Sequence, residues 1–180
     1  IITAGLFKGM ETLLKTATIL KEYSNISFEW HIVGYSSKDK YVQIAEKTTH
    51  IKSNNNNITF HGKLNAENLS DLLCKSDIYV HVSHIENSPN SVCEAMILGM
   101  PVIASYVGGT ASILTNEKDG ILVQDGDPYV LSGAILNYIK HPELASNYAQ
   151  SAKRKAIVRH NRKNIVNELL IAYEDIINCY

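Results

Sequence analysis

Long apolar runs, paired cysteines and an excess of charge of one sign are all missing from this sequence. A membrane-spanning helix needs about 20 consecutive apolar residues, so no such helix is predicted. The formal net charge of −1 does not favour binding to nucleic acid. The first residues do not combine a basic segment with a long apolar stretch, and no secretory signal peptide is expected.

The three cysteines, Cys74, Cys93 and Cys179, are odd in number and far apart. Neither a disulfide framework nor a zinc site has this spacing, so we expect three unpaired thiols and a cytoplasmic location. His81 and His84 are three positions apart near the end of an expected strand, where their side chains would point to opposite faces. The other histidines show no ligand spacing either, and the sequence predicts no metal site.

Strand-like and helix-like patterns alternate along the 180 residues, of which 45% are hydrophobic. This alternation predicts one Rossmann-like α/β domain, a parallel sheet with helices on both faces. The expected strands cover residues 1–4, 28–34, 58–61, 78–82, 101–105 and 121–123. The expected helices cover residues 9–23, 39–49, 66–75, 90–98 and 128–140, with two or three helical pieces after His141. Asn65, Ser88 and Asp127 are the expected N-caps.

The segment from Ser83 to Ser105 carries the most specific pattern. An apolar strand enters a polar loop that contains Glu86, and this loop enters a helix that contains Glu94. A helix N-terminus favours an anion because its first N–H groups are free. A carboxylate can accept hydrogen bonds from both hydroxyls of a sugar diol. A carboxylate beside a helix N-terminus therefore indicates a nucleotide-sugar site.

This segment also resembles a known family. Glu86, the run Glu94–Met96, the strand after Gly99 and the pair Gly108-Gly109 are similar to the C-terminal domain of retaining glycosyltransferases of the GT-B fold, called group 1 or family 4. Residues 77–140 match that pattern almost continuously, and a looser match covers residues 1–76. The resemblance implies that residues 1–180 form a single nucleotide-sugar-binding domain, the C-terminal half of a GT-B enzyme.

The resemblance assigns roles to the residues around the two glutamates. It implies that Glu94 holds the ribose of the nucleotide. Glu86 would contact hydroxyls of the donor sugar and would help to stabilise positive charge at the anomeric carbon. Lys8 and the backbone N–H groups near Asn90 and Ser91 would hold the diphosphate. Glu86 is thus the expected catalytic residue.

Further positions complete the implied site. Lys63 belongs to the loop that would lie against the base, and Gly108 and Gly109 would permit close approach of the backbone to a ligand. The chain departs from the family in two places. It has no basic residue from Thr3 to Phe7, where an arginine is usual, and it has Ala-Ser at residues 111–112 in place of Pro-Glu.

The reaction implied by the resemblance moves a sugar from a nucleotide-diphosphate donor to an acceptor hydroxyl with retention, with no cofactor and no metal ion. A glycan or a lipid-linked acceptor would bind an N-terminal domain that this sequence lacks. Residues 1–180 alone are therefore expected to bind the donor nucleotide without transferring sugar.

Two alternatives remain open from the sequence. One is a non-hydrolysing sugar-nucleotide epimerase, another enzyme class on the same fold. The other is a degenerate domain that binds nucleotide or protein without catalysis. A basic stretch at residues 153–163 is interpreted as a solvated helix face, with peripheral contact to anionic lipid at the inner membrane face as the alternative.

Overall fold

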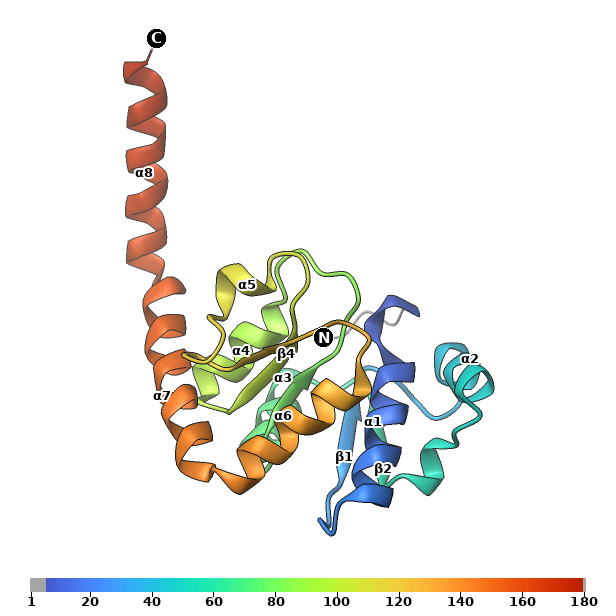
Figure 1. Cartoon of the computed structure of the whole chain (residues 1–180). Helices are drawn as coiled ribbons and strands as arrows, with labels where there is room; N and C mark the ends of the chain where they lie inside the picture. Colours follow the sequence, from blue (N-terminus) through green and yellow to red (C-terminus); the bar gives the residue numbers. More distant parts are fainter. Residues whose placement is uncertain (1–5, 180) are drawn as a thin grey trace.

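Strands and helices alternate along the chain in the computed structural model, which describes residues 6–179 (Figure 1). The strands are β1 (Trp30–Val33), β2 (Ile58–Gly62), β3 (Tyr79–His81), β4 (Val102–Ser105) and β5 (Ile121–Val123). The helices are α1 (Met10–Tyr23), α2 (Lys40–Thr49), α3 (Ala66–Cys74), α4 (Asn90–Leu98), α5 (Thr110–Ile113), α6 (Pro128–Lys140), α7 (Pro142–Arg159) and α8 (Arg162–Asn178). Two 3-10 turns, η1 (Leu6–Lys8) and η2 (Ser53–Asn55), complete the described elements.

The strands form two parallel ladders. In the first, β1 pairs with β2, and in the second, β3, β4 and β5 pair in that order. The expected fold class, a parallel Rossmann-like arrangement with helices on both faces, is confirmed. The prediction of one continuous sheet is not met within the described residues, because no strand pairing joins β1 to β3 there. The strand expected at residues 1–4 lies outside the described residues.

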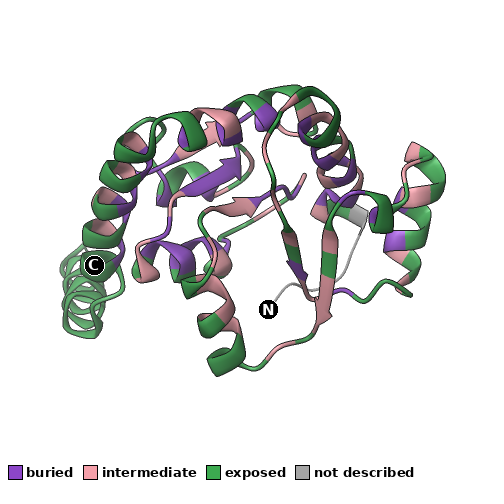
Figure 2. Ribbon diagram, turned by 90° about the horizontal axis from the view of Figure 1, so that it is seen from below, coloured by how far each residue is buried: buried purple, intermediate pink, exposed green. Residues whose placement is uncertain are grey.

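Strand β4 lies inside the core, and its four residues are all buried (Figure 2). Side chains alternate across a strand, so Val102 and Ala104 pack with α4 and α7, while Ile103 packs with α1 and α6 on the other face. A continuous apolar run is typical of a strand covered on both faces. Burying a side chain such as Ile103 contributes roughly 1.5–3 kcal/mol.

The hydrogen bonds at the starts of α3, α4 and α6 show which of the three predicted N-caps are present. The side chain of Asn65 accepts a hydrogen bond from the backbone N–H of Asn68, and that of Asp127 accepts from two N–H groups of α6, so both predictions are confirmed. The prediction for Ser88 is wrong. Helix α4 starts one residue later than a Ser88 cap requires, because the carbonyl of Pro89 accepts the first helical hydrogen bond, at 3.0 Å.

Other expectations need small corrections. The sequence did not predict the short helix α5, which follows the glycine pair after β4. Helix α1 starts at Met10, one residue after the expected start, because Gly9 has a left-handed backbone with φ 73°, and Lys8 lies just before it in η1. All three cysteines are unpaired, as expected.

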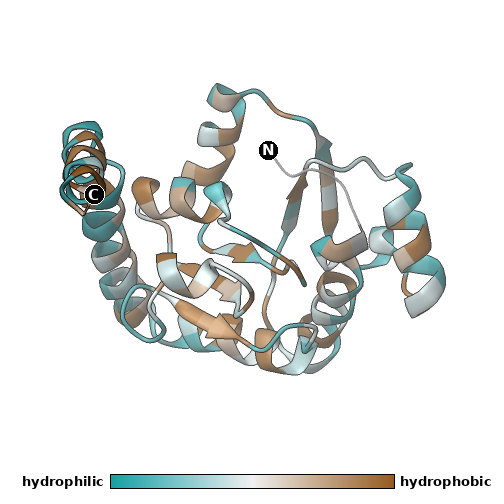
Figure 3. Cartoon of the chain, turned by 90° about the horizontal axis from the view of Figure 1, so that it is seen from above, coloured by the Kyte–Doolittle hydropathy of each residue, from teal (hydrophilic) through white to brown (hydrophobic). Residues whose placement is uncertain are grey.

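The C-terminal part is helical in two pieces, as predicted, but the two helices differ. Helix α7 buries alanines at spacings of three and four residues, and two of them, Ala152 and Ala156, pack in one core cluster with α4. Ala145 packs in a second cluster with α6 and β4. Helix α8 extends away from the sheets and exposes every residue (Figures 1 and 3). Between Leu6 and Cys179, no helix combines the length and the apolar character that crossing a membrane would require.

Two residues of the basic stretch at residues 153–163 make contacts within the protein. Lys155 lies 2.8 Å from the buried carboxylate of Asp119, and Arg159 donates to the carbonyl of Ser112 at 3.3 Å. Burial raises the pKa of Asp119, but Lys155, Ser151 and Thr115 outweigh burial and leave that pKa lowered. These contacts fasten α7 to the loop before β5, so part of the stretch is structural.

Candidate functional site

The loops that follow β3, β4 and β5 converge at one edge, where parallel strands present their carboxyl ends. Ligands of such sheets bind outside this edge. The loop after β3, residues 82–89, contains Glu86, and it leads directly into α4 with Glu94. The sequence pattern therefore lies where an α/β fold places its ligands.

The carboxylate of Glu86 contacts several side chains of the protein. Its Oε1 atom forms an ion pair with Nζ of Lys8 and lies 3.3 Å from Nε2 of His81. Only 15% of the Lys8 side chain and 13% of the Glu86 side chain are exposed. Burial raises the pKa of Glu86, but Lys8, Ser83 and His81 outweigh it, and the pKa is lowered. The ion pair thus brings together two predicted site residues, Lys8 and Glu86, at the carboxyl end of β3.

His81 was considered in the sequence only as a member of an unlikely metal pair. The structure buries it at the end of β3, where burial lowers its pKa despite the nearby charge of Glu86. In the neutral ring, one nitrogen carries the proton. A proton on Nε2 lets it donate to Glu86, and Nδ1 then remains a buried acceptor without a partner among the described residues.

Gly108 and Gly109 approach a backbone. A Cβ atom on Gly108 would lie 1.6 Å from the carbonyl oxygen of Glu86, and one on Gly109 would lie 1.9 Å from that of Asn87. Gly108 also has φ 47°, a region that other residues adopt rarely. The close contact is with the Glu86 loop, so the pair acts on the candidate site by fixing that loop.

Tyr79, at the start of β3, is subject to the charge of both glutamates and was not predicted as a site residue. A hydrogen bond from Ser91 reaches its phenol group, and both Glu94 and Glu86 act on it electrostatically. Burial is the main reason that its pKa is raised to about 12, and the two carboxylates add to the shift. No motif singles out a tyrosine at this strand position, so only the packing could identify it.

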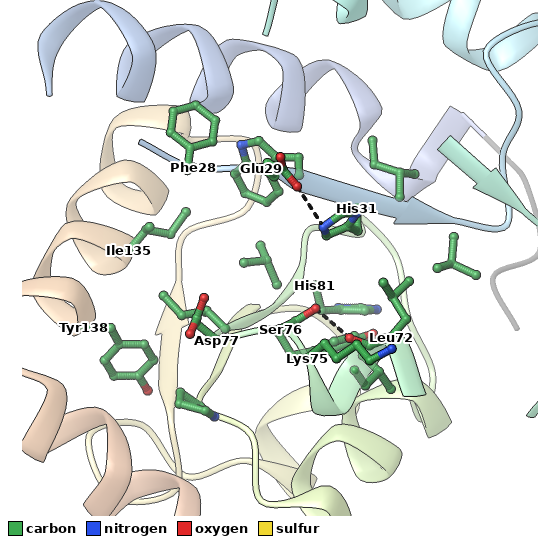
Figure 4. Close-up of a pocket in the computed structure, with 18 of the residues that line it drawn as sticks. Phe28, Glu29, His31, Leu72, Lys75, Ser76, Asp77, His81, Ile135 and Tyr138 are labelled. Carbon is green, nitrogen blue, oxygen red and sulfur yellow. Dashed lines mark hydrogen bonds and ion pairs between the residues drawn. The ribbon is translucent and has the colours of Figure 1, made fainter. Parts of the chain in front are cut away.

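A cavity of about 1270 Å³ lies between the two ladders. Figure 4 shows His31 of β1 and His81 of β3 on its walls. Most of the lining is apolar, but Lys8, Ser91 and Glu94 also border it. Three residues predicted to bind the nucleotide therefore face one space.

The remaining predicted residues lie outside the lining of this cavity. Asn90 is exposed at the first position of α4. Lys63 is exposed after β2, on the other ladder, and lies outside the cavity lining. Across residues 6–179, no group of three or more histidine, cysteine or acidic side chains is arranged to hold a metal ion.

The pattern that defines the glycosyl transferases group 1 matches residues 5–155 of this chain. The chain belongs to this family. A relative is an uncharacterized glycosyltransferase of Methanocaldococcus jannaschii, which is 27% identical over 175 residues. That match covers 96% of this chain and 43% of the relative.

Solved structures of glycosyltransferases have the same fold. Anabaena HepE, solved with UDP and glucose, superposes with a TM-score of 0.80 at 20% identity, over 97% of this chain and 47% of that protein. Sucrose-phosphate synthase of Thermosynechococcus elongatus gives a TM-score of 0.76 at 22% identity, over 98% and 44%. The chain thus spans less than half the length of these relatives. At this identity the structures show the GT-B half fold alone.

Proposed function

We propose that this chain is the donor-nucleotide domain of a retaining glycosyltransferase. The observation that carries the proposal is the shared edge at which Glu86, Lys8 and the start of α4 meet. In the relative from Anabaena, the solved complex contains UDP and glucose. A uridine diphosphate is therefore the first ligand to test.

The geometry supports a division of roles within the site. The free N–H groups at the start of α4 would hold the diphosphate, with the flanking amides of Asn90 and Ser91 nearest. Glu94 lies one turn further into the helix, where its carboxylate would accept from a ribose diol. Lys8 would exchange part of its contact with Glu86 for a phosphate, and Glu86 would then be free to face the sugar.

The protein's share of catalysis would be positioning and electrostatic stabilisation of the leaving diphosphate. We propose that no metal ion takes part, because Lys8 and helix N–H groups supply positive potential at the edge. An acceptor would bind a second domain across the cleft, and residues 1–180 alone would transfer no sugar.

Calorimetric titration of the full chain with UDP, GDP and ADP tests the proposal. Glu94→Ala should weaken binding of the preferred diphosphate about tenfold to a hundredfold, since hydrogen bonds to a charged group contribute about 1.5–3 kcal/mol. Glu174→Ala, at an exposed acid of α8, is the matched control and should bind like the parent. Equal binding by Glu94→Ala and the parent would refute the ribose role.

A further inference from the structure

His84 lies between two carboxylates from distant parts of the chain. Its Nδ1 atom is 2.5 Å from Oδ1 of Asp125, in the loop between β5 and α6. Its Nε2 atom contacts Oε1 of Glu11, in the first turn of α1. Its backbone N–H donates to the carbonyl of Phe7 at 2.7 Å. One residue therefore joins three segments at the edge of the candidate site.

The two side-chain contacts require a protonated ring. A neutral imidazole has one N–H, so it cannot donate to Asp125 and Glu11 together, whereas the imidazolium can. Burial lowers the pKa of His84, but the hydrogen bonds and charges of Glu11 and Asp125 outweigh burial and raise that pKa above its usual value. These two acids are the titratable groups that face the ring within residues 6–179.

His84 belongs to the same loop as Glu86, two positions earlier. The later part of this loop is held by Lys8 and by the close approach of Gly108 and Gly109. The His84 contacts hold its beginning. When the ring loses a proton, one carboxylate faces a nitrogen lone pair, and the repulsion separates the loop from α1 or from the β5–α6 loop.

We propose that protonated His84 is a positioning residue, which fixes the Glu86 loop for binding a nucleoside diphosphate, so that affinity falls when the imidazolium loses its proton. The ligand in this inference rests on the proposed function, whereas the ordering of the loop does not. The His84 contacts order the loop fully below about pH 6.5, which is the usual pKa of histidine. This order is lost as the pH rises through the raised pKa of the folded protein.

The order of the loop is measured without ligand, by amide hydrogen exchange of residues 83–87 in the full chain from about pH 5.5 to about pH 8.5. After correction for intrinsic exchange, protection of the His84 amide should fall about tenfold as the ring titrates. His84→Gln should abolish this step. His160→Gln, at an exposed histidine that ends α7, should retain it.

Asp125→Asn separates positioning from a general structural role. The side-chain amide can donate to the unprotonated Nδ1 while Nε2–H still donates to Glu11, so a neutral His84 keeps both contacts. Protection in this variant should therefore stay high above the pH at which the parent loses it. A parent without a pH step, or an unchanged step in His84→Gln or Asp125→Asn, would overturn the inference.

UDP affinity is then measured by calorimetry over the same pH range. The parent should lose affinity about threefold to tenfold relative to Asp125→Asn, and this ratio cancels the titration of the ligand phosphate, which has a pKa of about 6. Identical pH dependence in both proteins would overturn the positioning role. A pH step in exchange without UDP binding at any pH would overturn the proposed function and leave the loop result standing.

Discussion

The two ladders of this protein differ in how firmly their carboxyl ends are built. After β3 and β4, the loops touch each other, because Gly108 and Gly109 bring one backbone against the next. Glu86 of the loop after β3 is also paired with Lys8. At the end of β2, Gly62 has open space around its Cβ position, and the next residue, Lys63, is exposed. The strand ends of one fold therefore need not contribute equally to a site.

The same contrast appears in the strands. All four residues of β4 are buried, whereas β1 has one buried residue and exposes His31. A strand covered on both faces cannot shift without disturbing two layers of packing. The β3–β5 ladder is therefore the rigid support of the candidate site, and the following experiments test whether this difference between the ladders is real.

The largest effect is expected from Gly109→Ala. Gly109 has φ −78°, which alanine adopts without strain, but the added Cβ would lie 1.9 Å from the carbonyl oxygen of Asn87. We expect a loss of about 3 kcal/mol in the free energy of unfolding, as for overpacking. Gly62→Ala has only its positive φ of 62° to overcome and should cost about 1 kcal/mol.

Urea denaturation of the two glycine variants and the parent measures this difference. Comparable losses at Gly109 and Gly62 would mean that the loop after β3 can move away from the added methyl group. The loop ends of the β3–β5 ladder would then be no more rigid than the end of β2.

An intermediate effect is expected from acid. The pKa of Glu86 is lowered in the folded protein. Its contribution to the free energy of unfolding is therefore present above about pH 4.3, the usual pKa of glutamate, and is lost as the pH falls through the lowered pKa. Glu86→Gln should remove about 2 kcal/mol of stability at neutral pH, since hydrogen bonds to a charged group have this magnitude.

Unfolding measured from about pH 7 to about pH 3 should show a weaker pH dependence for Glu86→Gln than for the parent. Glu29→Gln is the control on the other ladder, because Glu29 lies beside β1 with 75% of its side chain exposed. It should follow the parent at every pH. If Glu29→Gln flattened the profile as much, the buried pair at Glu86 would not be the source of the acid response.

The smallest effect is expected from Tyr79→Phe. This change removes the hydroxyl that Ser91 contacts and should cost about 1 kcal/mol in the free energy of unfolding. Because the pKa of Tyr79 is about 12, the cost should be constant from about pH 6 to about pH 9. Tyr23→Phe, at an 81% exposed side chain that ends α1, should change stability by less than about 0.5 kcal/mol.

Chemical denaturation of the two tyrosine variants at several pH values provides the measurement. If Tyr79→Phe lowered the free energy of unfolding no more than Tyr23→Phe, the Tyr79 hydroxyl would not stabilise the β3–β5 ladder. The site would then depend on its backbone contacts and on the Glu86 pair alone.

Helices α7 and α8 show how far a local pattern extends. Both were predicted as helical from the sequence, and both are helical. The alanines of α7 allow close packing on α4, whereas the apolar side chains of α8, such as Leu169 and Ile177, are exposed in the structure. Periodicity indicates that a face is apolar, but it does not indicate what covers that face.

The sequence by itself determined the order and type of most elements, two of the three caps and the loop that contains Glu86. These features depend on residues close together in the chain, such as the alternation of apolar side chains and a cap beside its helix. The family pattern likewise covers a nearly continuous segment.

Only the tertiary structure decided which groups meet at the edge of the sheet. Lys8 and Glu86 are 78 positions apart, and His84 reaches Glu11 across 73 positions and Asp125 across 41. The same is true of Gly108 and Gly109, whose Cβ positions lie against the backbone carbonyls of Glu86 and Asn87. Contacts at such separations depend on how the loops converge after the strands have packed, and no local propensity encodes that arrangement.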